Sequence, residues 1–287
     1  MVLVADSAVQ LDYSVLKELN VEVCEYPFLV DGSEYPASMA MSGTEKEKIR
    51  SILKDKNKKV LTAGLKEKDL LEIYSRHKDE KIFSIHLSAS ASTATSQVIR
   101  KVISDNPELN ISYYDSKHLV SAYSVIVYEA AKMIRDGASE EETDSFLNQA
   151  PENTRILGVL YDLFYLNRTG RIGKAKAIMG TAMKVIPVLS SSNPPGDLIS
   201  FGKVKTPMQA VKKLSDTVAS DWEKHPGTRL SAVISVVGEH NNEAEKLASA
   251  VKNLGENAEV LLCGTNFTNM AHVGPDYFDI GYTFIKI

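Results

Sequence analysis

Apolar runs of strand length alternate with segments of helical periodicity along almost the whole of this 287-residue chain. In the first half the sequence predicts strands over residues 1–6, 21–30, 58–63, 81–88 and 110–116. Between and after them it predicts helices over residues 11–20, 45–55, 65–78, 94–104 and 117–137. Alternation of this kind indicates an α/β fold with a mostly parallel sheet flanked by helices.

The second half of the chain has a different sequence pattern. Residues 137–155 are polar and acidic, which predicts a surface helix leading to a domain boundary. Beyond it, residues 189–206 read as two strands joined by a Pro-Gly turn, and Thr206 with Pro207 predicts a helix start. We therefore expect two lobes: an N-terminal α/β lobe over 1–153, and a C-terminal α/β lobe over 154–287 with a mixed sheet.

Composition excludes several classes of protein. The net charge is −4 without a basic block, which argues against nucleic acid and against an anionic membrane surface as the main partner. The first ten residues read as a strand rather than a signal peptide. Two distant cysteines, Cys24 and Cys263, are expected to be reduced and buried, which indicates a cytoplasmic setting. The six histidines show no metal-ligand spacing, so neither a metal nor a cofactor is expected.

The predicted helix over 117–137 is apolar nearly all round and is interrupted by Glu129 and Lys132. These charges argue against a bilayer span. A helix of this kind is usually buried. The alternative is that it lines an apolar cavity.

Hydroxyl groups are concentrated where the strand over 81–88 meets the following helix. Between Ser88 and Ser96, six of nine residues are serine or threonine, and glycine is absent. The N-terminus of a helix attracts anions, and hydroxyls beside it add donors without adding charge. One helix cap needs only one hydroxyl, so the surplus suggests an anion site, although a serine-rich cap remains the alternative.

Other short motifs follow predicted strand ends. "ADS" ends at Ser7, "LTAGL" contains Thr62, and "YYDS" ends at Ser116. Ligands of open parallel sheets bind at the carboxyl ends of the strands, so these groups could face one crevice, although Ser and Asp are also common turn residues. In the second half, "YLNRTGRIG" contains Arg171, and "HVGPD" places His272 in an expected loop, where it could face a ligand.

Taken together, these motifs resemble the DegV family of bacterial fatty-acid-binding proteins. "ADS", "LTAGL", "LSASASTA", "YYDS", "YLNRTGRIG", "KVKT" and "HVGPD" follow the order of the family's motifs and run from residue 5 to residue 276, nearly the full length. The resemblance implies a two-lobe fold whose inter-lobe tunnel buries one long-chain fatty acid. It also implies that the protein is a lipid carrier and not an enzyme, and that it presents the acid to a separate fatty acid kinase subunit. A transient contact with a membrane surface fits such a carrier.

Carried over by motif, the ligand-binding residues would be Thr62, Ser92, Thr93, Arg171 and His272. Thr62 and Ser92 would donate to the carboxylate, His272 would lie beside it, and Arg171 would shape the tunnel mouth or the kinase-facing surface. The chain departs from the family's pattern at several positions. The departures are Ala63 and Leu65 for a serine and a proline, Thr93 for a glycine, Lys205 for an arginine, and Asp276 for the last glycine of HxGPG.

Two alternatives stay open at this stage. The first is a hydrolase or acyl transferase with Ser92 as nucleophile and His272 as base, although the chain has no G-x-S-x-G elbow. The second is a phosphate- or nucleotide-binding module, although no Walker or dinucleotide glycine motif is present. For a lipid tunnel, the apolar candidates are Phe28, Val125, Met133, Phe164 and the segment 177–189.

Overall fold

The computed structural model describes residues 1–178, 185–192 and 195–287, which form three β-sheets and the helices around them. Sheet A is entirely parallel, in the order β2-β1-β6-β7. Its strands are β1 (Val2–Asp6), β2 (Val21–Cys24), β6 (Ile82–His86) and β7 (Ile111–Asp115). The parallel sheet predicted for the first half is therefore present.

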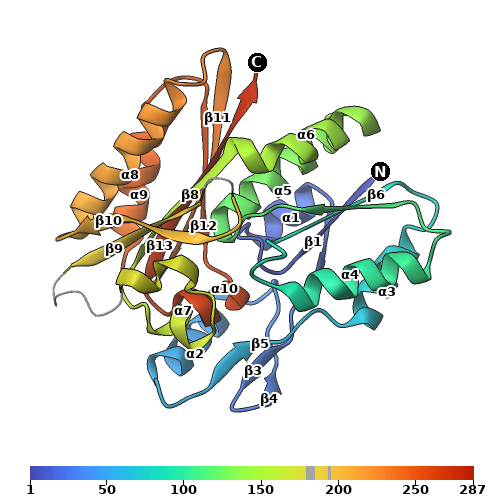
Figure 1. Cartoon of the computed structure of the whole chain (residues 1–287), viewed down its shortest axis with the longest axis horizontal. Coiled ribbons are helices and arrows are strands. Elements are labelled where there is room, and N and C mark those ends of the chain that lie inside the picture. The colour runs from blue at the N-terminus through green and yellow to red at the C-terminus, as the bar shows by residue number, and fades with distance from the viewer. Residues whose placement is uncertain (179–184, 193–194) are drawn as a thin grey trace.

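Helices cover sheet A as the alternation predicted. They are α1 (Tyr13–Glu18), α3 (Glu67–Arg76), α4 (Thr93–Asp105) and α5 (Val120–Arg135). Figure 1 shows α3 and α4 side by side at the outside of the molecule, with α5 nearer its centre.

Sheet C has six strands in the order β10-β9-β8-β13-β11-β12 and is mixed, because only β11 and β12 are parallel. Its strands are β8 (Thr154–Leu160), β9 (Ile186–Ser191), β10 (Leu198–Val204), β11 (Thr228–Val237), β12 (Ala258–Gly264) and β13 (Tyr277–Lys286). Helices α8 (Pro207–Trp222) and α9 (Asn241–Lys252) cover its outer face, and α5 packs on the other (Figure 1). The mixed sheet and the β9–β10 pair confirm the prediction for the second half.

Thr206 caps α8 as expected. Its hydroxyl accepts a hydrogen bond from the backbone N–H of Gln209 at 3.2 Å, and Pro207 occupies the first turn. This satisfies one of the free donors at the helix start, where a proline costs nothing because its missing N–H would have no partner in the helix.

One predicted strand is wrong. Residues 21–30 form two strands in different sheets, because the chain leaves sheet A after Cys24 and passes through Pro27, which cannot donate a hydrogen bond to a continued ladder. The second piece, β3 (Phe28–Val30), belongs to sheet B, a small antiparallel sheet ordered β4-β3-β5. Its other strands are β4 (Ser33–Tyr35) and β5 (Val60–Thr62). Thr62 therefore does not end a strand of the parallel sheet.

The remaining elements connect these sheets. They are α2 (Gly43–Lys54), α6 (Glu140–Asn153), α7 (Phe164–Arg168), a 3₁₀ helix (Gly173–Ile178) and α10 (Phe267–Val273). The chain passes from α6 into β8 without a linker. The division at 153/154 stays a prediction. Contacts cross this boundary in both directions, because α5 packs against β11 and β13, and α10 packs against α2 and β5.

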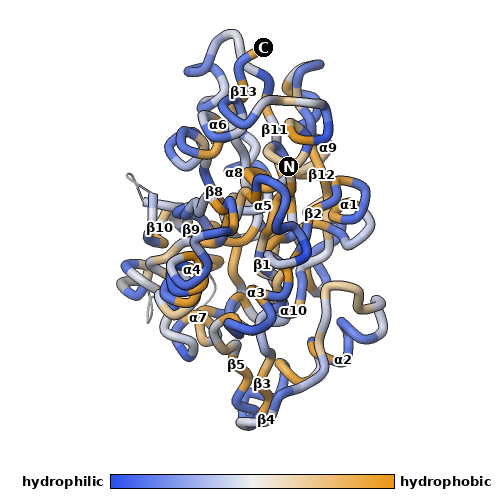
Figure 2. The backbone as a smooth tube through the Cα atoms, turned by 90° about the vertical axis from the view of Figure 1, so that its right-hand side faces the viewer, coloured by the Kyte–Doolittle hydropathy of each residue, from blue (hydrophilic) through white to orange (hydrophobic). Residues whose placement is uncertain are grey.

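The core has two parts separated by sheet C. Side chains alternate along β8, so that Ile156 and Leu160 join the large core that includes sheet A, whereas Leu157 and Val159 pack beneath α8 and α9. In Figure 2, hydrophobic residues (orange) gather toward the inside of the molecule, and hydrophilic residues (blue) lie mostly at its periphery.

Helix α5 lies within this core, as its all-round apolar sequence predicted. Its residues from Val120 to Val127 are all buried. Buried Glu129 forms a bidentate ion pair with Arg229 of β11. In the part of the chain that the structure describes, no helix is long and apolar enough to cross a membrane. Cys24 and Cys263 are free and buried, as expected.

Candidate functional site

A cavity with about 750 Å³ of empty space, its mouth included, lies between the inner face of sheet C and loops and helices from both halves of the chain. Most of its lining is apolar. The apolar lining residues are Leu87, Ala91, Leu119, Val120, Ile156, Gly158, Leu160, Leu166, Leu189, Leu198 and Val273. The others are Tyr26, Thr62, Ser92, Arg171, Thr268, Asn269, His272 and Tyr277.

Sheet C forms one wall of this cavity. Ile156, Gly158 and Leu160 face it from alternate positions of β8, and Leu189 of β9 is the cross-strand partner of Gly158. Leu119 and Val120, at the start of α5, also line the cavity. A ligand in it would be in contact mainly with hydrocarbon.

The Thr62 side chain and the His272 imidazole meet at the polar part of the cavity. The Thr62 Oγ1 and His272 Nε2 atoms lie 3.0 Å apart. Thr62 is the last residue of β5, and His272 lies in the last turn of α10. Helix α10 packs against β5, which brings these two distant motifs together.

The electrostatic surroundings of His272 favour a neutral ring. Burial and the nearby guanidinium groups of Arg171 and Arg168 lower the pKa of His272 from 6.5 to about 3. Its Nδ1 atom is buried and has no hydrogen-bond partner among the described residues. A neutral imidazole has one donor and one acceptor nitrogen, so this site has hydrogen-bonding capacity for a ligand.

Ser92 reaches the same cavity from the start of α4. It occupies the N-cap position, but its side chain does not cap the helix and instead donates to the Thr95 hydroxyl at 2.8 Å. The positive end of the α4 dipole is therefore at the cavity. Gly64 lies against this helix start: a Cβ at position 64 would be 3.3 Å from the Cβ of Ala94, so a side chain there would require a shift of a few tenths of an ångström.

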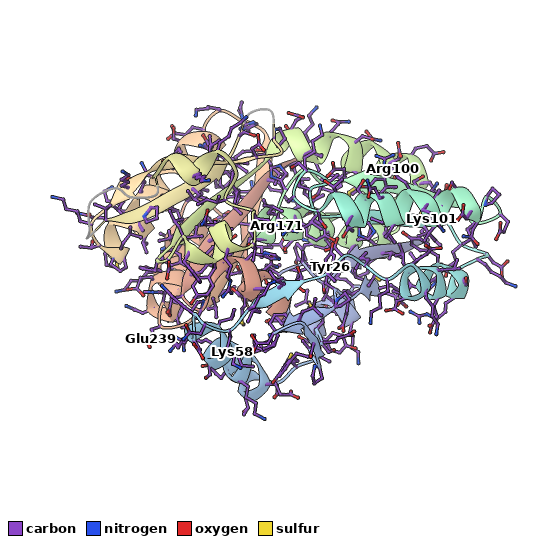
Figure 3. The ribbon with its side chains drawn as sticks, turned by 60° about the horizontal axis from the view of Figure 1, so that its bottom comes forward. Tyr26, Lys58, Arg100, Lys101, Arg171 and Glu239 are labelled. Carbon is purple, nitrogen blue, oxygen red and sulfur yellow. The ribbon has the colours of Figure 1, made fainter. Side chains whose placement is uncertain are left out.

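Arg171 is the cationic residue of the lining and is half-buried. Its Nε donates to the carbonyl of Ala91 at 3.3 Å, and an Nη1 donates to the carbonyl of Thr169. The first bond joins the segment between α7 and the 3₁₀ helix to the hydroxyl-rich loop of the first half. Figure 3 shows Arg171 and Tyr26 toward the middle of the molecule, whereas Lys101 of α4 lies farther out.

The structure thus brings together Thr62, Ser92, Arg171 and His272 around one cavity, but not Thr93. The Thr93 side chain is exposed, and its hydroxyl reaches the carbonyl of Ala89 at 3.4 Å. It begins the first turn of α4, and this direction takes it away from the lining. Its assignment as a ligand-binding residue stays a prediction.

Most of the other hydroxyl and acidic motifs support the loops rather than the lining. Asp6 accepts hydrogen bonds from Ala8, from Leu87 and from the His86 ring. Asp115 holds the Ser88–Ser92 segment by accepting from the backbone N–H of Ala89 at 3.0 Å. The predicted crevice of strand ends is therefore wrong in its geometry, because Asp6 and Asp115 hold loops and Thr62 belongs to another sheet.

The expected tunnel-lining residues are mostly wrong too. Phe28, Val125, Met133 and Phe164 are not part of the lining, and Val125 is fully buried in the core around α5. Of the segment 177–189, Leu189 lines the cavity, while residues 179–184 lie outside the described part of the chain. Apolar side chains are equally suited to core and cavity, so composition does not separate the two.

His272 was expected in a loop but belongs to α10. Asn266 caps this helix by accepting from the backbone N–H of Asn269 at 3.1 Å, and Gly274 ends it with a positive φ of 89°. An Asn cap and a Gly-Pro end are both helix signals that the sequence contains. The lining residues Tyr26 and Tyr277 carry no comparable signal, because only long-range packing brings them to the cavity.

The arrangement suits a long apolar ligand that has a single polar or anionic end. It offers less support for a serine nucleophile: the Ser92 hydroxyl bonds to Thr95, and the His272 ring bonds to Thr62 rather than to Ser92. In a nucleophile–base pair the base is within hydrogen-bond reach of the nucleophile and is oriented by a third group.

Comparison with known proteins gives consistent results. Residues 1–284 match the sequence model of a family described as "Uncharacterised protein, DegV family". A DegV domain-containing protein of Halalkalibacterium halodurans is 25% identical over 277 residues, which is 95% of this chain and 92% of that protein.

Solved structures show the same fold at lower identity. A fatty-acid-binding DegV family protein of Thermus thermophilus has a TM-score of 0.83 at 21% identity, covering 98% of both chains. A stearic-acid-binding protein of Eubacterium ventriosum has a TM-score of 0.84 at 18% identity, covering 99% of this chain and 98% of the other.

Proposed function

This chain belongs to the DegV family, and on that premise we propose that it binds one long-chain fatty acid. The acyl chain lies in the cavity between sheet C and the start of α5, and the carboxylate lies at Thr62, Ser92 and His272. The observation that carries the proposal is this combination of a mostly apolar lining with polar groups that include the Thr62–His272 pair. Fatty acids bound to structural relatives support it.

The energetics favour the tail as the source of affinity. A C16 acid has about 14 methylenes, each contributing about 0.8 kcal/mol on burial, which gives about 11 kcal/mol before the cost of association. The polar end then fixes which way the ligand lies and limits the desolvation penalty of the carboxylate. The Thr62 and Ser92 hydroxyls, the ring of His272 and the α4 N-terminus supply the donors, and Arg171 supplies a positive charge.

We further propose that the bound acid is presented to a fatty acid kinase subunit and that the protein acts as a carrier rather than as an enzyme. The motif resemblance supports this step. A fluorophosphonate probe distinguishes the carrier from the serine-nucleophile alternative. The carrier proposal expects no covalent label on Ser92, and stoichiometric labelling of Ser92 would contradict it.

The direct test of binding is to identify the molecule that the purified, folded protein carries. Gentle organic extraction of the purified protein followed by mass spectrometry should release about one fatty acid per chain. After delipidation, added palmitate should raise the melting temperature, because a ligand that binds only the folded state stabilises it. Absence of an extracted acid together with no thermal shift from C14 to C18 acids would refute the proposal.

A further inference from the structure

We infer that Arg50 and Asp276 act as positioning residues for His272, so that an ion pair outside the cavity sets the geometry of its polar end. The inference rests on the proposed function for its ligand and on observed contacts for its geometry. Arg50 lies on α2 in the first half of the chain, and Asp276 lies between α10 and β13 in the second. Neither residue lines the cavity.

The Arg50 side chain holds both residues that follow the Gly274 end of α10. Its Nε donates to the carbonyl oxygen of Pro275 at 3.0 Å, and its Nη2 donates to Oδ1 of Asp276 at 3.0 Å. Only three residues, Gly274 to Asp276, connect α10 to the long strand β13. The guanidinium therefore fixes the short connection that determines where the last turn of α10, with His272, is placed.

Burial shows that this contact is structural rather than incidental. The Arg50 side chain is 10% exposed, so its charge needs close partners. Asp276 is 36% exposed, whereas Glu47 and Glu239, the other two acids within ion-pair distance of Arg50, are 63% and 82% exposed. Asp276 is thus the principal counterion. Figure 3 shows Glu239 at the edge of the molecule.

Gly238 leaves room for this pair. Its φ is +95°, and a Cβ at this position would lie 2.1 Å from Oδ1 of Asp276 and 2.8 Å from the carbonyl oxygen of Pro275. Any side chain at position 238 would displace the Asp276 carboxylate that Arg50 holds. Arg50, Gly238 and Asp276 therefore act together to fix the connection between α10 and β13. The aspartate, a departure from the family's pattern, directs its charge to Arg50 and not into the cavity.

The opposite end of α10 is held separately. The Asn266 side chain donates to the carbonyl of Val9, and Asn269 donates to the carbonyl of Ala8 at 2.7 Å. With its start fixed by these amides, α10 is free to change direction mainly at its C-terminal end. Loss of the Arg50–Asp276 pair should therefore move His272 more than it moves Thr268 at the helix start.

The test compares palmitate with 1-hexadecanol, which has the same tail and a neutral end. We expect Asp276→Asn and Arg50→Gln to weaken palmitate binding about tenfold, the scale of one hydrogen bond to a charged group, and to change hexadecanol binding less than about twofold. Glu47→Gln is the matched control, since Glu47 contacts the same guanidinium from α2 itself; it should leave both affinities unchanged.

A readout without ligand makes the inference independent of the proposed function. The imidazole ¹⁵N signals of His272 in the delipidated protein should shift in Asp276→Asn and Arg50→Gln but not in Glu47→Gln. If Arg50→Gln fails to fold, Asp276→Asn alone decides. Unchanged His272 signals in the folded variants would overturn the inference. If the wild type binds neither palmitate nor other acids, the proposed function is refuted. The NMR comparison then still tests whether the Arg50–Asp276 ion pair positions His272.

Discussion

The Thr62 hydroxyl and the Nε2 atom of His272 lie 3.0 Å apart across 210 residues of sequence. Because the pKa of His272 is lowered to about 3, its ring is neutral at physiological pH and carries one N–H. If Thr62 donates to Nε2, the proton lies on Nδ1, the atom that has no partner among the described residues. That N–H is then available to a carboxylate.

Removal of two hydroxyls should weaken recognition of the carboxylate. We expect the double variant Thr62→Val with Ser92→Ala to lower the affinity for palmitate by about tenfold to a hundredfold, since each lost hydrogen bond to a charged group contributes about 1.5 kcal/mol or more. Thr93→Ala is the control, because its exposed hydroxyl lies outside the cavity. Calorimetric titration of delipidated protein measures the difference. Equal affinities in the double variant and the wild type would remove these residues from the site.

His272 should matter for presentation as well as for binding. We expect His272→Ala to reduce transfer of phosphate to bound palmitate in a reconstituted assay with a fatty acid kinase subunit, because the carboxylate loses a neighbour that fixes its orientation. Assays at saturating fatty acid separate this effect from weaker binding. Transfer at the wild-type rate would show that His272 has no part in presentation.

Gly158 should determine how much space the acyl chain has. A Cβ at this position would meet Leu160 and Tyr277 at 3.6 Å and Asp279 at 3.8 Å, which are ordinary contacts. Gly158→Ala should therefore raise the free energy of unfolding of the delipidated protein by about 0.5–1 kcal/mol while lowering its affinity for C16 and C18 acids.

Gly43→Ala provides the control for Gly158→Ala, because a Cβ at position 43 meets nothing within 4 Å. A larger residue, as in Gly158→Leu, should restrict binding to shorter acids or abolish it. The measurement is a competition series from C12 to C20 together with urea unfolding. An unchanged chain-length profile in Gly158→Leu would show that the tail does not pass this residue.

Two histidines whose pKa is lowered, His118 and His272, predict that stability falls on acidification. Burial lowers the pKa of His118 to about 4, and burial with Arg171 and Arg168 lowers that of His272 to about 3. Below pH 6.5 the unfolded chain takes up protons that the folded protein does not, so stability is lost as the pH falls.

Each such histidine contributes at most about 1.4 kcal/mol per pH unit to this slope. Urea unfolding of delipidated protein between pH 7 and pH 5 stays above the main range of carboxylate titration. The slope should decrease in His118→Gln and in His272→Gln. A flat profile, or one that neither substitution changes, would contradict the neutral state of these rings.

The sequence predicted what depends on local pattern. Alternating apolar runs indicated both sheets, and Thr206 with Pro207 indicated the start of α8, because caps and periodicity act over a few residues. It did not predict that Thr62 belongs to a separate sheet, since the partner strand of β5 is chosen by packing and not by its own three residues.

The candidate site was predictable only in part, for the same reason. Motif resemblance indicated Thr62, Ser92, Arg171 and His272, but the direction of the Thr93 side chain follows from the first turn of α4. Helix α10 was missed although Asn266 and Gly274 mark its ends, because a seven-residue helix shows too little periodicity. Burial by distant elements decides which apolar residues line a cavity, and one sequence does not contain that information.

A crystal structure of the protein with palmitate tests the central claim most directly. We predict a carboxylate within hydrogen-bonding distance of Ser92, Thr62 or Nδ1 of His272, with the alkyl chain between Val120 and Gly158. Palmitate bound elsewhere on the molecule, or in the cavity with its methyl end at the Thr62–His272 pair, would contradict the account.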